Sequence, residues 1–182
     1  MSSDPDRSIL LVGANPAVQL FDGDEVVALA SVWRVDWSPQ GRGTGVVLWH
    51  DGRVRTVGDD PALCRWLAER FVRHFPEAEG LPWPDPEHVE HVDHPVTVDI
   101  DLASGGRCDA GPVQVTWSGV LDRRPFATDD FALDGVPHGL RLVFAPCAEA
   151  TLTVDGHPVP GTLRRSGTPT RPGSSAFLTE SE

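Results

Sequence analysis

A regular alternation of apolar and polar residues marks the first third of the chain. Between residues 27 and 37 the odd positions are mainly apolar, whereas Arg34 and Asp36 point the other way, which is the period of a half-buried β-strand. Residues 45–50 and 53–57 are two further strand-like runs, and Asp51-Gly52 between them is a strong hairpin signal. The pattern predicts three consecutive antiparallel strands.

After residue 58 the apolar period changes to that of a helix. Leu63, Leu67, Phe71 and Phe75 recur at every fourth position. The acidic residues at positions 59 and 60 can cap a helix, and a proline at position 61 suits its first turn. We therefore expect one amphipathic helix near residues 61–75, ended by the proline at position 76.

The second half of the chain returns to strand patterns after an irregular, proline-rich connector at residues 76–95. Residues 96–102, 113–118 and 140–144 alternate between apolar and polar side chains, as strands do. Asp155-Gly156 predicts a further hairpin, and Asp134-Gly135 predicts another turn. From residue 163 onwards the composition is polar and rich in glycine and proline, which predicts a loose tail.

These elements predict a mainly β fold, an antiparallel β-barrel or sandwich with one inserted amphipathic helix. The alternative is an α+β sheet with the helix on one face. We expect one β-rich domain over residues 1–162, which contains the helix near 61–75 and the connector 76–95, and a loose C-terminal tail over 163–182.

Composition narrows the classes of partner. The formal net charge is −12, and all basic residues are arginines, a bias typical of GC-rich bacterial genomes. Such an acidic chain repels nucleic acid and anionic membrane surfaces, because both bind through clustered basic residues. No run approaches the roughly 20 apolar residues of a membrane span, and the acidic N-terminus does not resemble a signal peptide. We expect a cytoplasmic bacterial protein that binds neither nucleic acid nor membrane.

Three acid–histidine pairs in the connector form the sharpest local motif, with His88, His91 and His94 at a spacing of three. Imidazole and carboxylate groups are ligands for zinc, iron or manganese. The flanking prolines disfavour a helix, and in a strand His91 would point away from the other two. We therefore expect no metal site and no cofactor, and a metal-dependent enzyme that uses these histidines is the second alternative for function.

Other candidate chemistry is sparse. Asp99 and Asp101 share one face of a strand and are expected to face water. Cys64, Cys108 and Cys147 form neither a disulfide framework nor a metal pair, so buried free thiols are expected, with Cys108 in a glycine-rich loop. The chain contains no nucleophile elbow and no phosphate-binding glycine loop.

The tryptophans are the most suggestive feature of the sequence. Ligand sites combine apolar walls with a few placed polar groups, and we expect such a site to be formed by Trp33, Trp37, Trp49, Trp117, Arg34, His50 and His94. Trp66 on the helix would form one wall of this site, and the connector would act as its lid.

The preferred hypothesis is a protein that binds an apolar or aromatic small molecule, with a cofactor-independent cyclase or isomerase of biosynthesis as its catalytic form. The alternative is a protein-interaction or structural module without catalysis. Nothing in the sequence indicates an oligomer.

Overall fold

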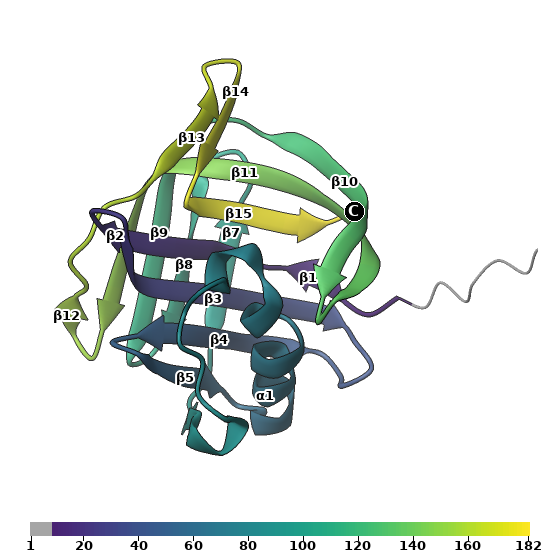
Figure 1. The fold of residues 1–182 in the computed structure, drawn as a ribbon, viewed down its shortest axis with the longest axis vertical. Coiled ribbons are helices and arrows are strands. Elements are labelled where there is room, and N and C mark those ends of the chain that lie inside the picture. Colours follow the sequence, from purple (N-terminus) through teal and green to yellow (C-terminus); the bar gives the residue numbers. More distant parts are fainter. Residues whose placement is uncertain (1–8) are drawn as a thin grey trace, which may run out of the picture.

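Most of the described chain, residues 9–182 of the computed structural model, is β structure interrupted by one α-helix. A 13-stranded sheet bends into two facing layers (Figure 1). The long strand β11 (Val136–Val154) belongs to both layers, because it pairs with β15 (Ala176–Ser181) as far as Pro146 and with β9 (Val113–Val120) from Cys147 onwards. The expected mainly β fold with an inserted helix is confirmed.

The first layer has the order β6-β5-β4-β3-β1-β15-β11, with β2 beside β3 and β15. Its other strands are β1 (Val12–Ala14), β2 (Ala17–Asp22), β3 (Glu25–Trp37), β4 (Gly43–His50), β5 (Arg53–Gly58) and β6 (Glu90–Asp93). The expected row of three strands corresponds to β3, β4 and β5, which pair antiparallel as predicted.

The second layer has the order β11-β9-β8-β7, and β12 also pairs with β11. Its other strands are β7 (Thr97–Asp101), β8 (Gly105–Ala110) and β12 (His157–Pro158). β10 (Arg124–Leu133) pairs with the first half of β11, and β13 (Arg165–Thr168) and β14 (Arg171–Ser174) form a separate hairpin that projects from the body in Figure 1.

The sheet is open, so the structure is a sandwich and the barrel form of the expected fold is wrong. The end strands β6 and β7 pair only with β5 and β8, and β5–β6 is the one parallel pair among the described strands. Residues 94–96 carry the chain from one layer directly to the other, where Thr44 Oγ1 donates a hydrogen bond to the Val96 carbonyl at 2.7 Å. After this short crossing, β7 pairs with β8 and not with β6.

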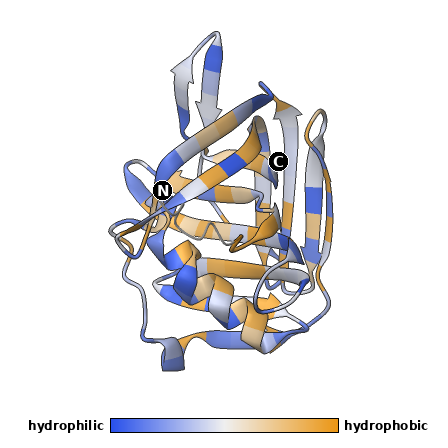
Figure 2. Ribbon diagram, turned by 90° about the vertical axis from the view of Figure 1, so that its right-hand side faces the viewer, coloured by the Kyte–Doolittle hydropathy of each residue, from blue (hydrophilic) through white to orange (hydrophobic). Residues whose placement is uncertain are grey.

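Strand β3 shows why the protein has two cores. Its even positions, such as Ala30 and Val32, face the core between the two layers. Its odd positions, such as Leu29 and Trp33, face a second core beneath the helix. Figure 2 shows hydrophobic residues along the strands of this layer and on the helix that covers it. The expected half-buried strand is therefore buried on both faces.

The helix α1 (Pro61–Arg70) begins as the sequence predicts. Asp60 Oδ1 accepts hydrogen bonds from the backbone N–H groups of Ala62 and Leu63, both at 3.0 Å. The helix lies very close to the sheet, because Gly58 leaves room for the Cys64 side chain. A Cβ atom at Gly58 would lie 2.5 Å from Cys64 Sγ.

The helix ends earlier than predicted. After Arg70 the chain tightens into the 3₁₀ turns η1 (Val72–His74) and η2 (Pro76–Ala78), so the expected end at residue 75 is wrong. The N–H groups of His74 and Phe75 donate to carbonyls three residues back, which is the 3₁₀ pattern. This change of path keeps Phe71 and Phe75 in edge-to-face contact, with ring centroids 6.4 Å apart.

The expected loose tail is wrong for its last segment. β15 lies between β1 and β11 in the first layer, and Leu178 on it is fully buried. Residues 163–175 are mainly polar, but a short apolar run follows them at residues 176–178. This run forms a strand because β11 and β1, which are distant in sequence, supply its hydrogen-bonding partners. Cys108, expected in a loop, lies instead in strand β8, because the glycines before it are paired with Trp117 and Ser118.

Candidate functional site

The expected tryptophan site does not form, because its members lie in different places. Trp33 and Trp49 belong to the core beneath the helix, whereas Trp117 belongs to the core between the layers, on the opposite face of the first layer. The Trp37 side chain, at the end of β3, is 50% exposed. The four tryptophans of the expected site therefore do not share one interior.

The polar members of the expected site are occupied elsewhere. Arg34 forms ion pairs with Asp36 and Glu180, and its hydrogen bond to Glu180 is the main cause that raises its pKa. His50 Nε2 lies 3.7 Å from Asp51. His94 Nδ1 lies 2.6 Å from the Pro95 carbonyl oxygen. None of the three is directed into a common cavity with the tryptophans.

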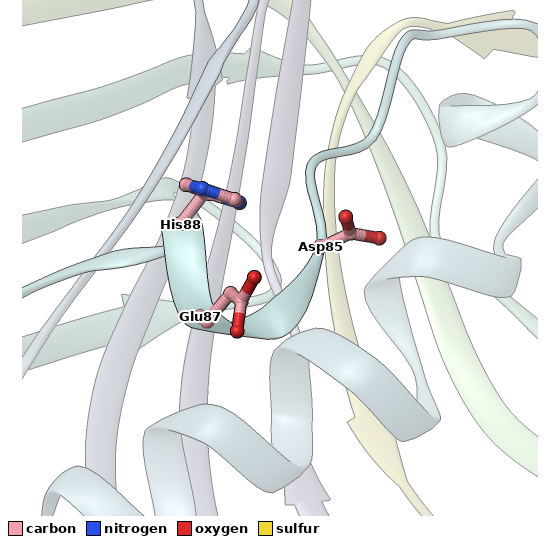
Figure 3. Close-up of side chains that lie close together, drawn as sticks. All are labelled: Asp85, Glu87 and His88. Atoms are coloured by element: carbon pink, nitrogen blue, oxygen red, sulfur yellow. The ribbon is translucent and has the colours of Figure 1, made fainter.

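The three histidines of the connector do not converge either. His88 is exposed, and His91 Nδ1 is 2.9 Å from the hydroxyl of buried Thr56. Within residues 9–182 the one group with metal-ligand atoms within 4.8 Å of one another is Asp85, Glu87 and His88 (Figure 3). All three lie on or beside the exposed turn η3 (Pro86–His88), so the histidine triad expected for a metal-dependent enzyme is not assembled.

The connector covers the helix-side core and is anchored to it. Trp49 Nε1 donates a hydrogen bond to the Pro82 carbonyl at 3.0 Å, and Trp83 Nε1 donates to Glu69 at 3.4 Å. Strand β6 then pairs with β5. These contacts make the connector a fixed cover of the core, and the expectation of a lid is not supported.

The cysteines are unsuited to nucleophilic chemistry. All three are free and buried, as expected. Burial raises the pKa of Cys64 and Cys108 to about 12 and that of Cys147 to about 11. The thiolate form that attacks carbon or binds metal is therefore scarce at neutral pH. Asp99 and Asp101 are exposed on β7, as the alternation predicts.

A small pocket lies where the tip of the β10–β11 hairpin reaches the helix. The cavity measures about 100 Å³, and we call it the hairpin pocket. Four separate parts of the chain line it: Leu10 before β1; Pro39 after β3; Trp66, Arg70 and Phe71 of the helix and its end; and Leu133, Asp134 and His138 of the hairpin.

Aromatic packing holds this region in place. The Trp66 and Phe71 rings meet edge to face with centroids 4.9 Å apart. Phe131 of β10 packs on Phe75 at 5.8 Å, which brings the hairpin tip onto the helix-side core. Leu133 is nearly fully buried there. The pocket thus has an apolar floor that is part of an aromatic cluster.

The polar groups of the hairpin pocket lie at its mouth. Arg70 is the last residue of α1 and is exposed. Asp134 occupies the first position of the hairpin turn with φ of 53°, followed by Gly135 with φ of 73°. Both residues thus adopt the left-handed conformation of a two-residue turn, which Asp-Gly favours. The turn presents the Asp134 carboxylate to solvent beside the pocket.

Sequence reasoning found the turn at Asp134-Gly135 but not the pocket. The pocket depends on contacts between residues near positions 10, 70 and 135, which no local pattern connects. Trp66, which was expected to form one wall of the tryptophan site, lines this pocket, whereas the other tryptophans of that site do not.

The chain matches no protein-family model, no curated protein and no solved structure. Within residues 9–182, none of the helices has the length and apolar character that a membrane crossing requires.

Proposed function

We propose that the protein binds a small apolar or aromatic group in the hairpin pocket. The observation that carries the proposal is the composition of this pocket: an apolar floor of Trp66, Phe71 and Leu133 with Arg70 and Asp134 at the mouth. Apolar walls with a few converging polar groups are typical of ligand sites.

The size of the pocket limits the ligand. Sites for drug-sized molecules occupy roughly 300–1,000 Å³, and an engineered cavity of about 150 Å³ accepts benzene. The hairpin pocket, at about 100 Å³, is smaller than both, so it encloses at most one branched aliphatic side chain or part of one ring. The rest of such a ligand would remain at the mouth of the pocket.

The proposal concerns binding and not catalysis. The residues that line the pocket include one guanidinium, one carboxylate and one imidazole, but no hydroxyl or thiol group. These groups give no reason to propose a cyclase or isomerase activity.

Two-dimensional ¹H–¹⁵N NMR of the indole N–H groups tests the proposal, because the chain has six tryptophans and only Trp66 lines the pocket. Trp66→Phe identifies its signal. A panel of small aromatic and branched aliphatic compounds should shift the Trp66 signal and leave that of Trp117 unchanged.

His138→Trp should fill the pocket and abolish the shift, whereas the matched variant Phe126→Trp, on the exposed part of the same hairpin, should keep it. A Trp66 signal that no compound in the panel moves at millimolar concentration would refute the proposed function.

A further inference from the structure

Two opposite charges at the mouth of the hairpin pocket do not pair with each other. Arg70 and Asp134 both line the pocket, yet no guanidinium nitrogen of Arg70 lies within 4.0 Å of a carboxylate oxygen of Asp134. Among residues 9–182, Arg70 has no hydrogen-bond or ion-pair partner. Asp134 has one distant contact, with His74 Nδ1 at 4.0 Å. Arg70 is therefore free to engage a ligand, and the Asp134 carboxylate, whose side chain is 70% exposed, remains accessible to one beside His74.

The presence of both charges on one pocket suits a ligand head group that carries both signs. A simple anion would gain from Arg70 but would be repelled by Asp134, and a simple cation would meet the reverse. A zwitterion satisfies both, because its negative end lies toward Arg70 and its positive end toward Asp134. A guanidinium is also suited to carboxylates, which it can bind through two parallel hydrogen bonds.

We propose that the ligand of the hairpin pocket is a free α-amino acid with an apolar or aromatic side chain. The side chain enters the cavity between Trp66 and Leu133, the α-carboxylate binds Arg70 and the α-ammonium binds Asp134. The cavity of about 100 Å³ has room for no more than the side chain, which leaves the zwitterionic head at the charged mouth. This inference rests on the proposed function, since it names the ligand class of the same pocket.

A set of matched probes tests which head group binds. Each probe is titrated into the full chain, and its affinity is measured from the shift of the Trp66 signal. L-Phenylalanine, 3-phenylpropanoate, 2-phenylethylamine and L-phenylalaninamide share the same ring and differ in charge. L-Leucine is measured alongside them, because its side chain is smaller. We expect the better of the two amino acids to bind tightest, and the three phenylalanine analogues to bind about tenfold or more weakly than phenylalanine, which is the usual effect of losing one charge-assisted hydrogen bond. Weak binding of the amide would also separate a free amino acid from the N-terminal residue of a peptide.

Two variants assign the two charges. Arg70→Gln should weaken amino-acid binding about tenfold or more and leave the affinity for 2-phenylethylamine unchanged or improved. Asp134→Asn should also weaken amino-acid binding about tenfold or more, but it should leave the affinity for 3-phenylpropanoate unchanged or improved. Asparagine accepts the left-handed turn conformation, so this variant keeps the hairpin.

Arg65→Gln is the control on the same helix, and Asp51→Asn is the control in the corresponding Asp-Gly turn between β4 and β5, where Asp51 has φ of 51°. Neither control residue lines the pocket, and neither variant should alter binding.

The outcomes separate this inference from the proposed function. If 3-phenylpropanoate or 2-phenylethylamine binds as tightly as the amino acids, or if both rim variants bind amino acids like the unaltered protein, the zwitterion assignment is wrong while the pocket remains a binding site. If no probe moves the Trp66 signal and the wider panel also fails, the proposed function falls with it.

Discussion

The indole Nε1 of Trp117 donates a buried hydrogen bond to the Ala17 carbonyl oxygen at 2.9 Å. Trp117 belongs to β9 in the second layer, and Ala17 begins β2 in the first. This bond joins the two layers across a core that consists otherwise mainly of valine, alanine and leucine side chains. The residue expected to bind a ligand is therefore a structural link.

Trp117→Phe should lower the free energy of unfolding by about 1–3 kcal/mol, the usual cost of leaving a buried group without its partner. Guanidinium denaturation measures this change. Trp37→Phe is the control, because Trp37 is 50% exposed and its replacement should change stability by less than about 0.5 kcal/mol. Equal effects of the two replacements would show that the bond between the layers contributes nothing.

Phe71→Ala should cost about 3–5 kcal/mol, as the truncation of a core phenylalanine does. Phe71 is 7% exposed, and its ring contacts those of Trp33, Trp66 and Phe75. Phe126→Ala removes the same side chain from an exposed position, at 42% exposure, and should cost much less. A loss below about 1 kcal/mol at Phe71 in chemical denaturation would mean that the helix does not depend on this cluster.

Replacement of residues 79–87 by a short Gly-Ser linker should destabilise the fold strongly. The excised segment contains the Pro82 carbonyl that accepts from Trp49, and it contains Leu81 and Trp83, which pack on the helix-side core. Trp83→Ala should give a smaller loss in the same direction. Thermal melting measures both changes. A deletion variant that melts like the unaltered protein would restore the interpretation of the connector as a mobile lid.

Glu77 should make stability depend on pH. Its desolvation by burial raises the pKa of its carboxyl group. The folded state therefore holds a proton more tightly than the unfolded state, so the stabilising effect is complete below the ordinary glutamate pKa of about 4 and is lost as pH rises through the higher folded pKa.

Glu77→Gln should accordingly raise the free energy of unfolding at pH 7, and this gain should vanish near pH 4. Glu79→Gln, at an exposed position two residues away, is the control and should show neither effect. An unaltered protein and Glu77→Gln variant of equal stability at pH 7 would contradict the burial argument.

The three cysteines should resist thiol reagents in the folded protein. Burial raises the pKa of Cys64 and Cys108 to about 12 and that of Cys147 to about 11, so at pH 8 none of the three should react with a disulfide reagent until the protein unfolds, when three thiols should be titrated. Because their unfolded pKa is about 8.5, stability should also fall as pH rises above this value. Rapid labelling of one thiol in the native state would mark a site that opens locally.

The sequence alone determined the elements whose signals are local. The alternation of β3, the capping of α1 by Asp60 and the turns at Asp51, Asp134 and Asp155 all depend on neighbouring residues, and the structure contains each of them. Exposure of Asp99 and Asp101 follows from the same alternation.

Tertiary structure decided what depends on distant partners. β15 has a weak local pattern and becomes a strand because β1 and β11 supply hydrogen bonds on its two sides. Alternation reveals that a strand has two faces but not what covers each, so Trp33 and Trp117 were expected together although they face different cores. The hairpin pocket likewise exists only because the chain folds the turn at Asp134 onto the end of the helix at Arg70, and no local pattern encodes a contact between segments so far apart.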